Sequence, residues 1–157
     1  MTVRMGQLDH MHLVVPDREA AAQWYEDTLG FERVAAYKHW WDIPGAPIHL
    51  SADGGTSGVA LFQAGEGHEL TDGIGMGIAF KVPGDQFIEF ASALGETIHI
   101  NAKNGHPLTA NSVVDLDLCF SFGFLDPYGH ELELNTYDYD ATKAHFEQAG
   151  VAPIRYW

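Results

Sequence analysis

The chain has 157 residues, of which 46% are hydrophobic and 12% aromatic, enough for one compact domain or two small fused modules with a real core. Eight Lys and Arg against 22 Asp and Glu give a formal charge of −14, which excludes nucleic acids and anionic membrane surfaces as electrostatic partners. No apolar run approaches the ~20 residues of a membrane span, and the first residues lack a signal-like apolar region, so we expect a cytoplasmic protein.

A strand followed by a helix is predicted at the start of the chain. Residues 9–15, DHMHLVV, alternate with the period of a strand, and this alternation places His10 and His12 on one face. Asp17 is the expected N-cap of the helix, and Gly30 stands where a glycine ends one. Three short β-like runs complete a β-α-β-β-β order, at residues 31–43, 46–52 and 58–64.

The second half of the chain repeats this order. Its segment GIAFKVPGDQFIEFASALGE aligns with HMHLVVPDREAAAQWYEDTLGF when Val82 is placed on Val15, and this register puts Gly77 opposite His10. Asp85 is then the expected N-cap of the second helix. The other elements expected in this half are strands at residues 96–102, 114–122 and 130–137, and a last helix at 140–148 before a tail that packs back on the domain.

Two glutamates follow a tight turn near the end of the chain. Asp126-Pro127-Tyr128-Gly129 suits a type I turn, and the next residues alternate so that Glu131 and Glu133 share the polar face of a strand. If this face meets water, the glutamates are merely solvated. If it lines a cavity, they are candidates for metal ligation or acid–base chemistry.

With these segments in place, the chain resembles the vicinal oxygen chelate superfamily, which includes glyoxalase I, extradiol dioxygenases, and fosfomycin- and bleomycin-resistance proteins. The segments LDHMHLVVPDREAAAQWYEDTLGF and FLDPYGHELEL carry the resemblance. It implies an α+β fold in which two tandem βαβββ modules form a curled, cup-shaped mixed sheet with the helices outside. The whole chain, 1–157, is then a single domain, with module one at 6–66, module two at 73–139, and a C-terminal helix and tail at 140–157.

The resemblance also implies a divalent metal ion on the floor of the cup. The family's first-strand histidine falls on His10, and its last-strand glutamate falls on Glu133. The other two ligand positions lack a donor: one is Gly77, and the other falls on residues 60–62, which are Ala, Leu and Phe. Two ligands hold a transition metal weakly, so the site is either completed by other residues or empty.

Four further side chains are candidates to complete this site. His12 and Glu131 share the faces of the two expected ligands, and His49 and His99 lie on predicted inner strands; Gln63 is a weaker oxygen donor. We assign proton transfer to Glu131 or His12. The expected ion is Fe, Mn, Ni or Zn. Without metal, the same histidines and glutamates could simply hydrogen-bond to one another and keep the cup polar.

Two functions therefore stay open on the sequence. The first is a small-molecule enzyme, a metal-dependent lyase, isomerase or oxygenase. The second is a metal-free protein of the bleomycin-resistance type that sequesters an amphipathic ligand in a cup lined by Phe, Trp and Tyr. Tyr37, Trp40 and Trp41 are expected to be either core or cup-wall aromatics. In either case the resemblance implies a homodimer. Cys119 is predicted to fill the core, and the other histidines to lie on the surface: His39, His68, His106, His130 and His145.

Overall fold

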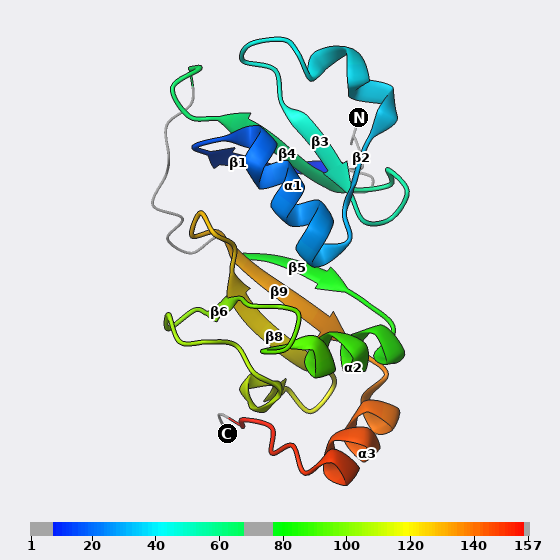
Figure 1. The fold of residues 1–157 in the computed structure, drawn as a ribbon. Helices are drawn as coiled ribbons and strands as arrows, with labels where there is room; N and C mark the ends of the chain where they lie inside the picture. The colour runs from blue at the N-terminus through cyan, green and yellow to red at the C-terminus, as the bar shows by residue number, and fades with distance from the viewer. Residues whose placement is uncertain (1–7, 68–76, 156–157) are drawn as a thin grey trace, which may run out of the picture. The chain divides into compact units, whose positions relative to one another are not determined.

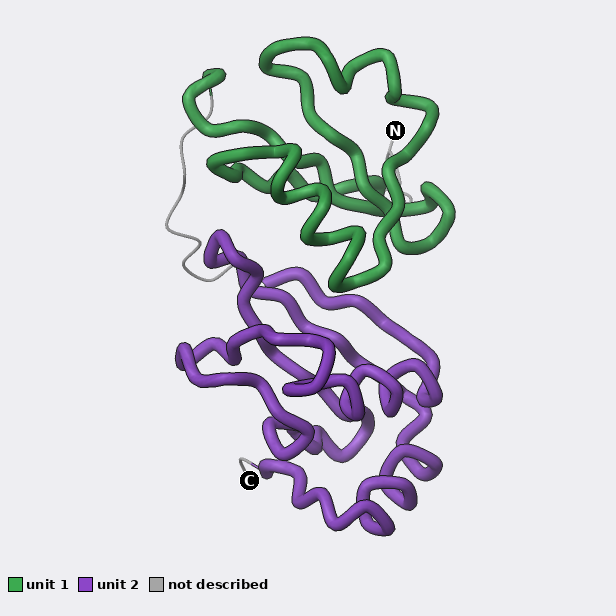
Figure 2. Tube along the Cα trace, in the orientation of Figure 1, with its two compact units in different colours: residues 1–72 green, residues 73–157 purple. Residues whose placement is uncertain are grey.

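The computed structural model describes residues 8–67 and 77–155, and the chain divides into two compact units, residues 1–72 and 73–157 (Figure 2). Each unit has an α+β fold built on its own mixed sheet. Across the described residues, no helix has both the length and the apolar character that crossing a membrane requires.

Unit 1 has the predicted β-α-β-β-β order. Its sheet runs β1-β4-β3-β2, with β1 and β4 parallel and the other pairs antiparallel (Figure 1). Two parallel strands cannot be joined by a tight turn, so the chain between β1 and β4 has to cross over. Helix α1 begins this long connection. The elements are β1 His10–Val15, α1 Arg18–Leu29, β2 Glu32–Arg33, β3 Ile48–Ser51 and β4 Gly58–Gln63.

Helix α1 begins and ends where the sequence predicts. The Asp17 carboxylate accepts hydrogen bonds from the backbone N–H groups of Glu19 and Ala20, and Gly30 ends the helix in the left-handed conformation at φ 68°. The buried face of the helix includes Tyr25, which is fully buried. The apolar face of the sheet, with Leu13 and Val15, is buried too.

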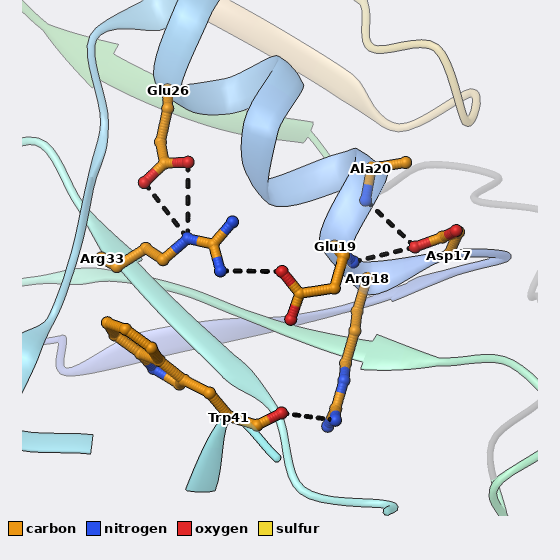
Figure 3. Close-up of polar contacts among 7 residues, drawn as sticks. All are labelled: Asp17, Arg18, Glu19, Ala20, Glu26, Arg33 and Trp41. Atoms are coloured by element: carbon orange, nitrogen blue, oxygen red, sulfur yellow. Dashed lines mark hydrogen bonds and ion pairs between the residues drawn. The ribbon is translucent and has the colours of Figure 1, made fainter. Parts of the chain in front are cut away.

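Two arginines tie the loops of unit 1 to α1 (Figure 3). Arg18 is buried, with only 8% of its surface exposed, and it donates a hydrogen bond to the carbonyl of Trp41 at 2.8 Å. Arg33 forms ion pairs with Glu19 at 2.8 Å and Glu26 at 3.2 Å. The buried Arg18 guanidinium is satisfied by backbone carbonyls, and the Arg33 guanidinium by two carboxylates, so each cation has hydrogen-bond acceptors.

The prediction of a strand over residues 31–43 is largely wrong. Only β2 is extended, and Ala35–Trp40 forms a 3-10 helix. The alternation of polar and apolar residues suggested a strand, but Tyr37 and Trp40 stack one helical turn apart, with ring centroids 4.9 Å from each other. Arg18 also binds the backbone carbonyl of Trp41, just beyond this helix.

Unit 2 repeats the strand order, β5-β9-β8-β6, with β5 and β9 parallel (Figure 1). A short extra strand, β7, pairs with β8. The elements are β5 Gly77–Lys81, α2 Gly84–Ala93, β6 Asn101–Ala102, β7 Val114–Asp115, β8 Phe120–Leu125, β9 Glu131–Thr136 and α3 Tyr139–Ala149.

Three predictions for unit 2 need correction. The strand expected at 96–102 is only the two residues of β6, and the run at 114–122 is split into β7 and β8. The split occurs because the Asp115 carboxylate accepts the backbone N–H of Asp117, which turns the chain with a φ of 65°. Asp85 is not the N-cap of α2, since the carboxylate of Asp138 takes the backbone N–H of Gly84 at 2.7 Å.

The core of unit 2 is built from phenylalanines. Phe87 of α2 and Phe122 of β8 stack with ring centroids 5.0 Å apart, and both are fully buried. Phe120 packs in turn against Phe146 of α3. A helix is thus bound to the apolar face of the sheet, and this leaves the other face for the glutamates of β9.

The described part of the tail packs back on this unit, as predicted. Ile154 forms a bridge with Val114, and Arg155 donates through Nε to the buried carboxylate of Asp115 at 3.0 Å. Tyr139 also donates to this carboxylate at 3.0 Å. Burial by itself raises the pKa of Asp115, but these donors and the Asp117 N–H outweigh it and leave the pKa below its usual value. The aromatic end, residues 156–157, lies outside the described residues.

Candidate functional site

Two histidines of β1 face each other on the polar face of unit 1. The Nε2 atoms of His10 and His12 are 3.1 Å apart, and their rings stack with centroids at 5.0 Å. The Asp9 carboxylate contacts the other nitrogen of His10, Nδ1. A carboxylate on Nδ1 favours the proton at that nitrogen, so in the hydrogen bond between the two rings Nε2–H of His12 donates and Nε2 of His10 accepts.

A third histidine joins this pair. His49 of β3 is 7% exposed, and its ring meets that of His10 edge to face at 4.9 Å and lies 4.2 Å from Tyr37. Burial, and then the nearby His10, lower the pKa of His49 below its usual value. The site therefore holds His49 in its neutral form among aromatic rings, consistent with its predicted place on an inner strand.

The register of β4 decides which side chains stand beside these histidines. Ala60 pairs directly with His12 on one side and with His49 on the other, and it carries no donor. Gly58 pairs with His10. Gln63 pairs with Val15, so alternation along the strand puts it on the opposite face, and the weak donor expected there is not part of this cluster.

In unit 2 the two predicted glutamates share one cation. The Nζ atom of Lys103 lies 3.0 Å from Glu131 Oε2 and 3.2 Å from Glu133 Oε1. Burial by itself lowers the pKa of Lys103, but the two carboxylates outweigh it and raise the pKa above its usual value. The lysine is therefore charged, and it compensates one of the two negative charges.

The first strand of unit 2 brings no ligand to these glutamates. Gly77 pairs with Glu131, and Ala79 pairs with Glu133. A Cβ added to Gly77 would meet nothing closer than 3.9 Å, so the site has room for a side chain that the sequence does not supply.

A cavity of about 410 Å³ opens beside Glu133 within unit 2. Polar groups and the stem of Lys103 line one part, and apolar side chains such as Leu116 and Ile154 line another. Cavities of this size and mixed character suit small organic molecules. Of the two glutamates of β9, Glu133 therefore borders a cavity, which answers for this residue the choice left open by the sequence.

Several other predicted residues are now placed. His99 is exposed and lies outside any strand, so it is not an inner-strand ligand. His130 is not a surface residue, because its side chain is 18% exposed and its Nδ1 lies 2.6 Å from the buried carboxylate of Asp126. Cys119 is buried as expected. His39, His106 and His145 are exposed, and His68 lies outside the described residues.

The four ligand positions implied by the family resemblance fit a metal ion only in part. His10 and Glu133 carry donors, whereas Ala60 and Gly77 do not, and Glu133 is ion-paired. Within residues 8–67 and 77–155, no group of three or more His, Cys, Asp or Glu side chains has an arrangement that could hold a metal. His10 and His12 are the nearest pair of nitrogen donors, and their Nε2 atoms are joined by a hydrogen bond of 3.1 Å that a metal ion would have to replace.

Sequence reasoning missed two members of these clusters. Asp9 could have been found, because a carboxylate next to a histidine on a strand is a plausible partner for its ring. Nothing in the sequence predicted the contact of Lys103 with the glutamates, since Lys103 lies in the segment AKNGHP, whose composition indicates only a loop between strands.

Comparisons with known proteins agree on one family. Residues 7–134 match the family described as Glyoxalase/Bleomycin resistance protein/Dioxygenase superfamily. A comparison with curated proteins finds no match.

Solved structures share the fold at low sequence identity. Oxidase ChaP-H2 is 24% identical, with a TM-score of 0.60 over 90% of this chain and 99% of its own. A glyoxalase family protein from Bacillus anthracis is 15% identical, with a TM-score of 0.59 over 88% of this chain and 100% of its own. Lactoylglutathione lyase from Agrobacterium tumefaciens is 16% identical, with a TM-score of 0.50 over 84% and 94%. At these identities the likeness shows the fold alone.

Proposed function

The chain belongs to the Glyoxalase/Bleomycin resistance protein/Dioxygenase superfamily, and from this premise we propose that it is a small-molecule enzyme that uses a divalent metal ion to stabilise an oxyanion of its substrate. When bound, such an ion supplies a Lewis acid that polarises substrate oxygens. Proteins of similar fold include one named as a lactoylglutathione lyase and one named as an oxidase.

The spacing of His10 and His12 is the observation that carries this proposal. Their Nε2 atoms are 3.1 Å apart. Two nitrogens that each bind one ion at about 2.0–2.1 Å are separated by roughly 2.9–3.4 Å, depending on the angle at the metal. The pair is thus already set at the spacing of two adjacent ligands, and Asp9 supports His10 from behind, as carboxylates commonly do for metal-bound histidines.

The remaining roles follow from the family pattern. Glu133 stays the predicted carboxylate ligand, and to bind an ion it has to exchange its contact with Lys103. With the Nε2 of His12 turned toward His10, Glu131 is the better candidate to move a proton to or from the substrate. The metal is Fe, Mn, Ni or Zn, and the enzyme is a homodimer, as expected from the family resemblance.

A second function is favoured by a different observation. Lys103 already compensates the carboxylates of unit 2, and the ligand positions at Ala60 and Gly77 lack donors. A protein that holds an organic ligand without metal needs nothing more than the cavity of about 410 Å³ and its polar groups. This second function is the sequestration of a ligand without metal, as in proteins of the bleomycin-resistance type.

Elemental analysis separates the two functions. We would purify the protein without an affinity tag or chelator, together with His10→Ala and His12→Ala, and use His145→Ala as the matched control because His145 is exposed and outside the cluster. The metalloenzyme predicts roughly one metal ion per chain in the wild type and the control, and a loss of at least about tenfold in affinity in the two cluster variants. Wild-type protein that stays metal-free after dialysis against Mn, Fe, Ni or Zn would instead rule out the metalloenzyme, and ligand binding to the cavity would then be the next measurement.

A further inference from the structure

The cavity of unit 2 has an apolar side and a polar side. Its apolar side includes Val114 and Leu116, at and just after β7, together with Ile154 of the tail. Its polar side includes Ser121 of β8 and Glu133 of β9. Both β7 and β9 pair with β8, and neighbouring strands are about 4.8 Å apart, so the two sides lie roughly 10 Å from each other.

The tail contributes to the apolar side from outside the part of the chain that matches the family, since that match ends at residue 134. Two backbone hydrogen bonds hold Ile154 in place: its N–H donates to the carbonyl of Val113 at 2.8 Å, and its carbonyl accepts from Asp115 at 2.9 Å. The next residue, Arg155, is ion-paired with Asp115. This wall is therefore a feature of the chain itself and is not implied by the family resemblance.

The polar side has hydrogen-bond acceptors that lack a donor. Ser121 is only 5% exposed, and its hydroxyl has no hydrogen-bond partner in the part of the chain that the structure describes. It pairs across the strands with Asn135, whose side-chain oxygen is buried and also without a partner among the described residues. Lys103 contacts Oε1 of Glu133 and leaves Oε2 for another donor. Because buried polar atoms are normally hydrogen-bonded, this side favours a ligand with donor groups.

The charges at the cavity leave a negative excess. Glu133 and Lys103 line it, and Glu131 shares the same lysine. Two carboxylates around one ammonium group leave one negative charge uncompensated, and the whole chain carries a formal charge of −14. An anionic ligand is repelled here, whereas an organic cation is attracted. A primary ammonium group has three N–H donors, so it supplies both the charge and the hydrogen bonds that this side lacks.

We propose that the cavity of unit 2 binds a small primary amine that carries an apolar group. The ammonium lies at Glu133 and Ser121, and the apolar group lies against Val114, Leu116 and Ile154. A cavity of about 410 Å³ has room for a molecule that spans the roughly 10 Å between its two sides. The inference rests on the second function proposed above, ligand binding in this cavity without metal, and it names the ligand class.

The test uses three probes with the same terminal phenyl ring and nearly the same length: phenylbutylamine, phenylbutanol and phenylbutyrate. They present an ammonium, a hydroxyl and a carboxylate group. Each is titrated into the full chain at pH 8, where ordinary histidines are uncharged, and binding is followed in ¹H–¹⁵N correlation spectra. We expect the amine to shift the amide signals of Ser121 and Gly123 and to bind at least about tenfold more tightly than the butyrate, with the alcohol between them.

Glu133→Gln tests the place of the ammonium group, because it removes the excess charge and keeps the shape of the side chain. It should weaken binding of the amine about three- to tenfold and leave the alcohol unchanged. The matched control is Glu89→Gln, which changes the net charge equally but is exposed on α2. An equal loss in the two variants would reveal long-range attraction alone and would overturn the proposed site.

Ile154→Ala tests the apolar wall. It should weaken all three probes by a similar factor, about two- to fivefold, because it removes a contact with the ring that they share. Leu118→Ala is the matched control, since Leu118 is 77% exposed and does not line the cavity. Unchanged binding in Ile154→Ala would contradict the place given to the apolar group.

The three probes also separate this inference from the function on which it rests. If the alcohol or the butyrate binds as tightly as the amine, the ligand class is wrong, but ligand binding in the cavity stands. If none of the three binds to protein with a well-dispersed spectrum, the inference and ligand binding in the cavity both fail. The metal-dependent function is decided independently by the metal content of His10→Ala and His12→Ala.

Discussion

The two units share a strand order but place opposite chemistry on equivalent positions. In unit 1 the first strand carries His10 and His12, and its partner strand offers only Gly58 and Ala60. In unit 2 the first strand offers Gly77 and Ala79, and its partner strand carries Glu131 and Glu133. One unit thus presents imidazoles and the other carboxylates from matched registers.

This difference shows how a repeated backbone can be divided between two tasks. The apolar faces of both sheets are buried and hold each unit together, so they tolerate little change. The polar faces differ instead, with His10 and His12 on the first strand of unit 1 and Glu131 and Glu133 on the last strand of unit 2. A substitution on one face should therefore affect stability, and a substitution on the other should affect binding.

The largest effect is expected from the apolar face of β9. Leu132 is fully buried, so Leu132→Ala should lower the free energy of unfolding by about 2–5 kcal/mol through lost burial and a cavity. Its neighbour Glu131 points to the other face, and Glu131→Ala should change the same quantity by less than about 1 kcal/mol. Urea unfolding followed by circular dichroism measures both. Similar losses of unfolding free energy in the two variants would show that both faces of β9 contribute equally to stability.

A smaller loss of stability is expected when Gly58 of unit 1 is substituted, because its position has no room for a side chain. A Cβ at Gly58 would lie 2.1 Å from the carbonyl oxygen of Leu50, a backbone atom that cannot turn aside. Gly58→Ala should therefore cost about 1–3 kcal/mol in unfolding free energy. Gly77→Ala is the matched control, because its Cβ would meet nothing within 3.9 Å, and it should be neutral or slightly stabilising. A harmless Gly58→Ala would show that unit 1 could have carried glutamates too.

The smallest effect concerns the tail, which follows the repeated elements of unit 2. Arg155→Met should lower the unfolding free energy only slightly, because Asp115 loses a charged donor but keeps Tyr139 and a backbone N–H, and Arg155 is itself half exposed to solvent.

This effect should depend on pH. The pKa of Asp115 in the folded chain lies below its usual 3.8, so its contribution is complete above that value and is lost as the pH falls through the folded pKa. The difference between wild type and Arg155→Met should therefore hold steady well above pH 3.8 and shrink as the pH falls below 3.8. A difference that stays constant over this range would mean that the carboxylate is not the partner that matters.

Local patterns predicted much of this fold. The N-cap Asp17 and the C-terminal Gly30 marked α1 because the signals lie within a few residues of the structure they create. The alternation around Glu131 and Glu133 identified β9 and its faces for the same reason. The strand expected across Tyr37 and Trp40 failed, because ring contacts and Arg18, both non-local, hold that segment in a 3-10 helix.

The candidate site was predicted less completely. The family resemblance pointed to His10 and Glu133, but it could not show that Lys103, thirty positions before Glu133, reaches both glutamates. That contact depends on a glycine at position 123 of another strand. Such an arrangement arises only when the strands are paired, so a single sequence contains no local pattern for it.

The capping of the two helices bears on the order in which the units fold. Helix α1 carries its own N-cap, Asp17, and this helix start can form as soon as those residues leave the ribosome. Helix α2 receives its capping carboxylate from Asp138, 54 residues further along the chain. Contacts between residues so distant in sequence close slowly. During synthesis, α1 can therefore be complete early, while α2 has to wait for almost the whole chain before its first turn is secured.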